Sequence, residues 1–199
     1  MALPRMQPII PIGRKAPFDD PDWLFDLKYD GFRGLCHLER GRCWFMSRNS
    51  NVLSRLNELC AQVAAEIGVD DAVLDGEVIV ANRTGRPVFI DLFRRKRPPG
   101  YVAFDILWLN GADLRSLPLG ERRQRLQRIL PARSPTISEA LSVTGRGHEL
   151  YELMRAHDLE GIVAKRLADP YGPHTRWLKI KNPDYSQKDG RAELFNRSR

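Results

Sequence analysis

The sequence predicts an α+β domain in which antiparallel sheets carry flanking helices. Short apolar runs between residues 23 and 47 are separated by the dipeptides Asp30-Gly31 and Arg40-Gly41, a pattern typical of antiparallel strands joined by turns. Apolar residues between 53 and 67 instead recur at helical spacing. No internal repeat, low-complexity tract or clear linker interrupts the chain, so we expect one mixed unit.

The rest of the chain continues these two patterns. Residues 72–80 are rich in β-forming side chains around Asp75-Gly76, which predicts a hairpin or a bulged strand. Residues 101–109 are strongly apolar and end at the turn Asn110-Gly111, as expected for a strand. The remaining expected elements are a helix over 147–157 and strands over 161–165 and 176–180.

A further helix is expected between Pro118 and Pro131, because proline can open a helix and cannot continue one. Its apolar side chains are expected to face inward and its arginines outward, the latter being Arg122, Arg123, Arg125 and Arg128. This face and the run Arg94, Arg95, Lys96 and Arg97 are candidate nucleic-acid-binding patches. A solvated surface explains each patch equally well.

Composition predicts three regions: a proline-rich, extended lead-in over 1–21, a folded domain over 22–185 and a polar tail over 186–199. No apolar run approaches the roughly 20 residues of a membrane span, and the start lacks a signal-peptide pattern. We therefore expect a cytoplasmic protein with no membrane partner. The three cysteines lack metal-ligand spacing and are expected to be ordinary thiols.

The charge balance favours a polyanionic partner. The net charge is +7 and the isoelectric point is about 9.6, although many basic proteins bind no polyanion. Lysine is scarce beside arginine, and only its amine can lose a proton and act as a nucleophile. Four of the seven lysines fall in three short segments: Lys28, Lys165, Lys179 and Lys181.

The first of these segments is the stretch from Phe25 to Arg33, in which Lys28 stands just before the turn Asp30-Gly31. One interpretation is a simple turn with solvated charges. The other is a lysine held at a rigid strand end, with a glycine that lets a ligand approach the backbone. The segment alone does not separate the two.

Two carboxylates and a lysine pair occupy comparable positions. Glu77 and Glu160 each adjoin a glycine and an apolar run. Lys179 and Lys181 alternate along a strand, so their ammonium groups share one face, which is unfavourable unless an anion lies beside them. A nucleophilic lysine, carboxylates for a divalent metal and lysines for a phosphate together supply what nucleotidyl transfer requires.

These segments resemble those of the covalent nucleotidyltransferases, and most closely the adenylation domain of bacterial ATP-dependent DNA ligases, including the non-homologous end-joining ligases. The match runs from about residue 22 to residue 182. It rests on six segments in the family's order: Lys28 to Arg33, Ser47 to Asn49, Asp75 to Glu77, Phe104-Asp105, Glu160 to Val163 and Trp177 to Lys181. The resemblance implies an ATP-grasp-like fold of antiparallel sheets with the nucleotide between them.

The resemblance also implies a role for each matching residue. Lys28 would form the bond to AMP, Arg33 would contact the ribose, and Arg48 would contact the nucleotide or a 5′-phosphate. Glu77 would bind the ribose or a metal, and Glu160 a metal, either Mg²⁺ or Mn²⁺. The other implied nucleotide contacts are Asp26, Phe104 stacking on adenine, Arg176, and Lys179 with Lys181 on the α-phosphate.

Two features depart from the family. Asp26 stands where many of these ligases have glutamate, and about 18 residues follow Lys181, too few for the usual OB-fold domain. The implied function is a monomeric ATP-dependent DNA ligase domain that seals nicked or broken DNA, with an OB-fold or end-joining partner possible in trans. An RNA ligase, an mRNA-capping guanylyltransferase and a non-catalytic nucleic-acid-binding module remain as alternatives.

Overall fold

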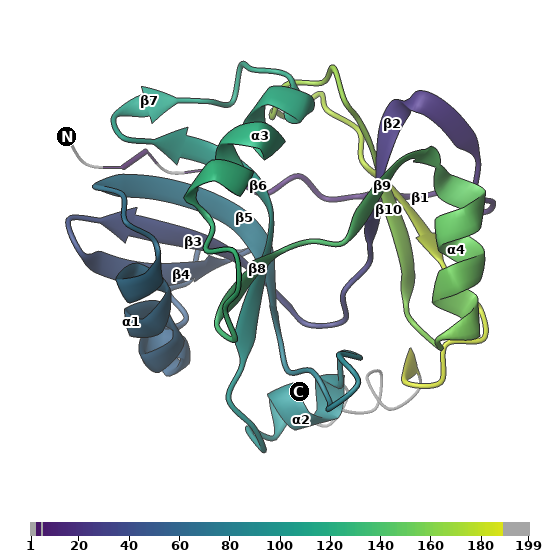
Figure 1. Cartoon of the computed structure of the whole chain (residues 1–199), viewed down its shortest axis with the longest axis horizontal. Helices are drawn as coiled ribbons and strands as arrows, with labels where there is room; N and C mark the ends of the chain where they lie inside the picture. The colour runs from purple at the N-terminus through teal and green to yellow at the C-terminus, as the bar shows by residue number, and fades with distance from the viewer. Residues whose placement is uncertain (1–2, 5, 189–199) are drawn as a thin grey trace.

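The computed structural model describes residues 3–4 and 6–188, and its strands form two sheets (Figure 1). The larger sheet has the strand order β4-β3-β5-β6-β7, with β8 also paired to β6. The smaller sheet has the order β1-β11-β10-β2-β9. Neighbouring strands are antiparallel except for β8 beside β6 and β1 beside β11. This architecture confirms the predicted α+β class.

The strands of the larger sheet are β3 (Phe32–Glu39), β4 (Arg42–Ser47), β5 (Asp71–Ile79), β6 (Gly100–Leu109), β7 (Ala112–Asp113) and β8 (Ile137–Glu139). Those of the smaller sheet are β1 (Ile12–Gly13), β2 (Asp19–Leu27), β9 (Ser142–Arg146), β10 (Gly161–Arg166) and β11 (Leu178–Lys181). The helices are η1 (Ser54–Leu56), α1 (Asn57–Glu66), α2 (Phe89–Phe93), α3 (Leu119–Ile129) and α4 (Gly147–Ala156).

The core has three parts, and the middle one joins the two sheets. Helices α1 and α3 pack on the larger sheet, and α4 packs on the smaller one (Figure 1). Between the sheets, a third apolar cluster includes Leu35, Val73 and Phe104 from the larger sheet and Trp177 from beside β11. We call this region the seam.

Strand alternation decides which side chains reach the seam. In β5, Leu74 and Val78 pack under the helices, so the odd-numbered residues point to the opposite face. In β10, Ile162 and Ala164 pack against α4 in the same way. The polar residues at alternate positions of both sheets are therefore brought together at the seam.

Gly76 shows why glycine is needed in the Asp75-Gly76-Glu77 segment. A Cβ at this position would lie 2.4 Å from the carbonyl oxygen of Val102 and 2.6 Å from the Tyr101 ring. Strand β5 passes straight through this point, and its register against β6 shifts just before it, between Val73 and Leu74 and between Asp75 and Gly76. The bulged strand is therefore the correct alternative, and the hairpin is not formed.

Several local features differ from the expected secondary structure, among them strands β7, β8 and β9, which lie where no strand was expected. Part of the expected lead-in over 1–21 joins the smaller sheet, because it contains β1 and β2 begins at Asp19. The short helix α2 lies in a stretch where no helix was expected. Within the expected tail, Ser186 and Gln187 hydrogen-bond to Asp158 and to the backbone of Pro87; residues 189–199 lie outside the described part of the chain. No helix among the described residues is long and apolar enough to span a membrane.

The expected outward face of α3 is wrong for two of its four arginines. Arg122 is fully buried and its guanidinium pairs with the carboxylate of Asp105, with an Nε–Oδ1 distance of 2.8 Å. Arg123 is also buried and donates to the carbonyl oxygens of Phe104 and Ala140. Both share the inward face with Leu119 and Leu126, because positions three and four apart lie on one side of a helix. Neither side chain can therefore track a phosphate backbone.

We predict that Arg122→Ala destabilises the fold by about 3–5 kcal/mol, because it leaves the buried Asp105 carboxylate without its cation. Urea denaturation of both proteins measures this difference. Arg128→Ala is the matched control, since Arg128 is exposed on the same helix and should change stability by less than about 0.5 kcal/mol. Similar losses in the two variants would contradict this account of α3.

Candidate active site

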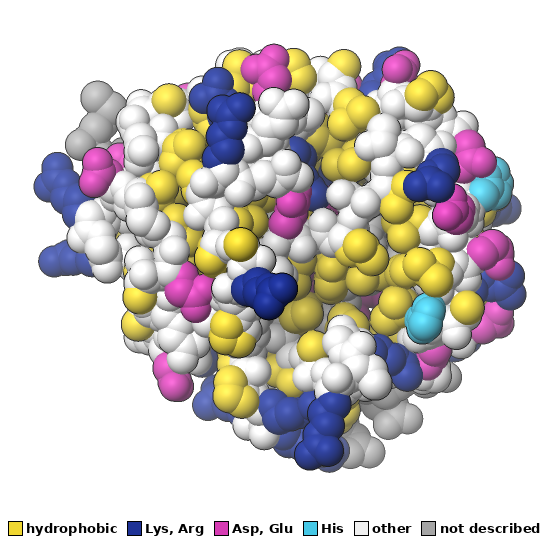
Figure 2. All heavy atoms as spheres, viewed as in Figure 1, with side chains coloured by type: hydrophobic (Ala, Val, Ile, Leu, Met, Phe, Trp, Pro, Cys, Tyr) yellow, Lys and Arg dark blue, Asp and Glu magenta, His cyan; other side chains and the backbone are white. Residues whose placement is uncertain are grey.

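A cleft of about 610 Å³ lies at the seam and is lined by residues of both sheets. Figure 2 shows hydrophobic side chains along the seam on the viewed face. Nine of the ten residues predicted to act in catalysis, nucleotide binding or metal binding line this cleft, namely Asp26, Lys28, Arg33, Arg48, Glu77, Phe104, Glu160, Lys179 and Lys181. The tenth, Arg176, is exposed and does not line the cleft.

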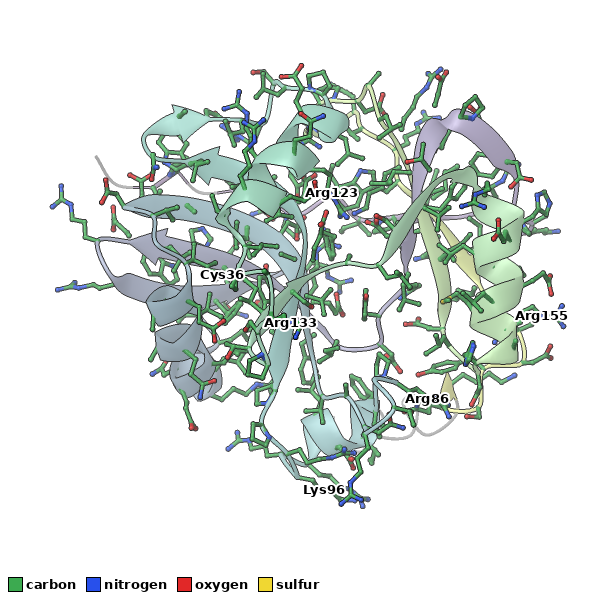
Figure 3. The ribbon with its side chains drawn as sticks, viewed as in Figure 1. Cys36, Arg86, Lys96, Arg123, Arg133 and Arg155 are labelled. Atoms are coloured by element: carbon green, nitrogen blue, oxygen red, sulfur yellow. The ribbon has the colours of Figure 1, made fainter. Side chains whose placement is uncertain are left out.

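The predicted basic run lies apart from the cleft. Lys and Arg side chains gather over α2, where Lys96 is labelled (Figures 2 and 3). Arg95, Lys96 and Arg97 line a separate depression beside Arg55. Lys96 and Arg97 both pair with Asp91, so part of the positive charge is already neutralised. Binding of nucleic acid by the run Arg94 to Arg97 stays a prediction.

Lys28 directly follows β2, where the backbone is held in place by a hydrogen bond from its N–H to the carbonyl oxygen of Gly161. Its Nζ lies 2.8 Å from Oε2 of Glu160, and the two side chains are 20% and 9% exposed. The predicted nucleophile and the predicted metal ligand are therefore direct neighbours. A base or a competing cation must release the Lys28 ammonium from Glu160 before the amine can attack.

A group of cations surrounds one part of the cleft. Lys179 and Lys181 alternate along β11 and both line the cleft, which confirms that they share a face. Partial burial lowers the pKa of Lys179, and repulsion from Lys181, Lys28 and Arg48 lowers it further. Among the described residues, no carboxylate lies within 4.0 Å of the ammonium of Lys179 or Lys181. An anion placed between these groups would relieve the repulsion.

Aromatic rings and a buried lysine form another part of the cleft. The rings of Phe104 and Trp177 meet edge to face, and Nζ of Lys165 lies 4.0 Å from the centroid of Phe104. The same nitrogen lies 2.5 Å from Oδ2 of Asp26. Burial lowers the pKa of Lys165, and the negative charge of Asp26 opposes this change. The cleft thus offers a hydrogen-bond donor and an acceptor beside two aromatic rings.

Much of the Phe104 ring is already covered. The residue is only 8% exposed, and the guanidinium of Arg33 lies 4.5 Å from the ring centroid in addition to Lys165. These are cation–π distances. Stacking of Phe104 on adenine therefore stays a prediction that requires rearrangement of at least part of this cover.

Arg33 connects several walls of the cleft. Its guanidinium forms a bidentate pair with Asp75, with an Nε–Oδ1 distance of 2.6 Å and an Nη2–Oδ2 distance of 2.5 Å. The hydroxyl of Tyr171 donates to the same carboxylate over 2.6 Å and accepts from the backbone N–H of Ile9 over 3.1 Å. The arginine predicted to contact ribose is therefore held in place by the fully buried Asp75.

Comparisons with known proteins agree with this arrangement. A sequence profile of the family described as ATP dependent DNA ligase domain matches residues 14–181. The chain belongs to this family. It is 32% identical over 184 residues to the SPbeta prophage-derived DNA ligase-like protein LigB of Bacillus subtilis, covering 87% of this chain and 66% of that protein.

Two further relatives come from mycobacteria. The non-homologous end joining DNA repair protein LigD of Mycobacterium tuberculosis is 31% identical over 175 residues, covering 85% of this chain but only 23% of that protein. A solved structure of mycobacterial DNA ligase D complexed with ATP and MES superposes with a TM-score of 0.76 at 28% identity, covering 88% of this chain and 60% of that one. The ligase domain described here thus spans a fraction of these relatives.

The structure adds residues of the ligase domain that motif reasoning did not assign to the site. Lys165, Tyr171 and Asp75 were not predicted to act there. Lys165 nevertheless lines the cleft, Asp75 pairs with Arg33, and Tyr171 donates a hydrogen bond to Asp75. Alternation in β10 could have indicated Lys165, because Ile162 and Ala164 mark the opposite, apolar face. Tyr171 lies between strands, where sequence periodicity carries no signal.

We predict that Tyr171→Phe destabilises the ligase domain by about 1–3 kcal/mol, because Asp75 loses a hydrogen bond and the N–H of Ile9 loses its acceptor. Urea denaturation measures the change. Tyr151→Phe serves as the comparison, since that hydroxyl donates a hydrogen bond to the carbonyl oxygen of Lys181, and its loss should cost about 1 kcal/mol. A Tyr171→Phe variant as stable as the original protein would show that the seam does not depend on this hydroxyl.

Proposed function

We propose that this ligase domain transfers an adenylyl group from ATP through a covalent lysine intermediate on Lys28. The observation that carries the proposal is the position of Lys28, which lies beside Glu160 in a cleft that also contains Lys179, Lys181 and Arg48. A nucleophilic amine beside several cations suits the attack of a nitrogen on a phosphoryl group. Family membership and the ATP-bound relative support the choice of nucleotide.

In the first step the neutral amine of Lys28 attacks the α-phosphorus of ATP. A P–N bond forms, the bond between the α-phosphorus and the bridging oxygen breaks, and pyrophosphate leaves. Lys179 and Lys181 would stabilise the negative charge that develops on the α-phosphate oxygens. The attacking nitrogen loses its proton, which the carboxylate of Glu160 would accept because its Oε2 lies 2.8 Å from the Lys28 nitrogen.

The later steps follow from the chemistry of the lysine–AMP bond. A 5′-phosphate oxygen of a nucleic acid would attack the AMP phosphorus, the P–N bond would break, and Lys28 would be regenerated. A 3′-hydroxyl would then attack the activated 5′-phosphate and release AMP. Arg48 is exposed at the edge of the cleft, where it would contact the incoming phosphate. Nicked or broken DNA is the proposed substrate, in line with the names of the relatives.

The site suits a divalent cation that is held jointly by side chains of the protein and by phosphate oxygens of the nucleotide. Among the described residues, no group of three or more His, Cys, Asp or Glu side chains could hold a metal alone. Glu160 and Glu77 both line the cleft, and Mg²⁺ is commonly held by one or two carboxylates together with phosphate oxygens and water. Bound there, Mg²⁺ or Mn²⁺ would polarise the phosphate that Lys28 attacks.

We predict that Lys28→Arg abolishes covalent labelling of the protein by α-³²P-ATP, because a guanidinium stays protonated and has no free lone pair. Labelled protein is detected after denaturing electrophoresis, with α-³²P-GTP in parallel to test the guanylyltransferase alternative. Lys15→Arg is the control, since Lys15 is exposed and lies outside the cleft. An AMP-labelled Lys28→Arg protein, or no labelling of the original protein, would contradict the proposal.

A second prediction concerns Glu160. Glu160→Gln should slow lysine adenylation by about tenfold or more, and additional Mn²⁺ should recover part of the rate. Single-turnover rates across a Mg²⁺ and a Mn²⁺ titration measure both effects. Glu152→Gln, an exposed carboxylate on α4, should leave the titration unchanged. Equal adenylation rates for Glu160→Gln and the original protein at every metal concentration would contradict metal binding by Glu160.

A further inference from the structure

One wall of the cleft comes from a segment that precedes the matched family region. Residues 6–13, which we call the N-terminal strap, lie before residue 14, where the family match begins. Pro8, Ile9, Ile10 and Pro11 of this strap nevertheless line the same cleft as Lys28. The sequence motifs alone place no function in the strap.

The strap is held in place from both sheets. Tyr171 accepts from the N–H of Ile9, and the N–H of Ile12 donates to the carbonyl oxygen of Trp177 over 2.9 Å. At the other end, the side-chain amide of Gln7 donates to the hydroxyl of Ser50 over 3.0 Å. Pro8 and Pro11 also favour extended backbone at the residues before them. These contacts fix the position of the strap, so it forms a defined wall of the cleft.

The chemistry of the strap points to the nucleoside part of the ligand. Residues 6–13 carry no charged side chain, whereas the phosphate-binding lysines lie on β11. The contacts of Ile9 with Tyr171 and Arg33 place it beside the aromatic part of the cleft. Uncharged, apolar side chains there suit a base or a sugar and do not suit a phosphate.

Ile10 presents an exposed apolar side chain to the cleft, where a bound ligand would cover it. It lines the cleft and is 59% exposed, although Met6 and Ile9 of the same strap are buried in the seam. A large exposed apolar side chain at a cleft wall loses contact with water when a ligand covers it, which favours binding. We infer that the strap is a nucleoside-binding element of the cleft and that Ile10 packs against the base or ribose of the bound nucleotide.

This inference rests on the proposed function, and a pair of variants tests it. Ile10→Ser should raise the KM for ATP in lysine adenylation about fivefold, the scale expected for the loss of one partly buried apolar contact, with the maximal rate nearly unchanged. Ile10→Val should remain close to the original protein. Ile12→Ser is the matched control, because Ile12 is 49% exposed on the same strap but does not line the cleft.

Competition separates the nucleoside from the phosphates. Ile10→Ser should raise the inhibition constant of AMP and leave that of inorganic tripolyphosphate unchanged. An unchanged KM in Ile10→Ser, an equal change in Ile12→Ser, or an equal weakening of both inhibitors would overturn the inference. Urea denaturation of each variant confirms that the fold is intact. If the original protein formed no AMP adduct at all, the proposed function would fail instead, so the two failures are distinguishable.

Discussion

The seam depends on the burial of one carboxylate, that of Asp75. This side chain is fully buried, and a buried charge is stable only when it is paired and hydrogen-bonded. Arg33 from β3 and Tyr171 from the loop before β11 satisfy it, and Tyr171 in turn holds the backbone of Ile9. One electrostatic requirement therefore draws a strand of the larger sheet, a loop next to the smaller sheet and the N-terminal strap to the same point.

Two more buried ion pairs connect α3 to the seam. Arg122 pairs with Asp105 of β6. Arg123 (Figure 3) donates a hydrogen bond to the carbonyl oxygen of Phe104 and lies near the carboxylate of Asp26 in β2. Asp26 also pairs with Lys165. Such pairs add little net stability because desolvation offsets their attraction, but breaking one is costly. They connect α3 to the aromatic part of the cleft. Among the described residues, Lys179 and Lys181 have no carboxylate within 4.0 Å of their ammonium groups, and like-charge repulsion lowers the pKa of Lys179, so the two lysines suit a ligand that supplies negative charge.

Prediction from the sequence succeeded where a pattern was local. Alternation placed Lys179 and Lys181 on one face, and helical spacing located the helix over 147–157, observed as α4. The prediction that Arg122 and Arg123 face outward was wrong. A guanidinium can occupy an inward position of a helix when a carboxylate or carbonyl oxygens accept its hydrogen bonds. No local sequence pattern reveals those partners. The helix α2, only five residues long, is too short for periodicity to be recognised.

The sequence by itself determined the fold class, the family and nine of the residues that line the cleft, because these depend on residue type, order and short spacings. Tertiary structure alone decided that Lys28 lies beside Glu160, that Lys165 pairs with Asp26, and that the strap completes the cleft wall. Each of these contacts joins residues more than 100 positions apart or depends on a loop. The physical reason is that buried charges and backbone groups find their partners only when the two sheets pack together.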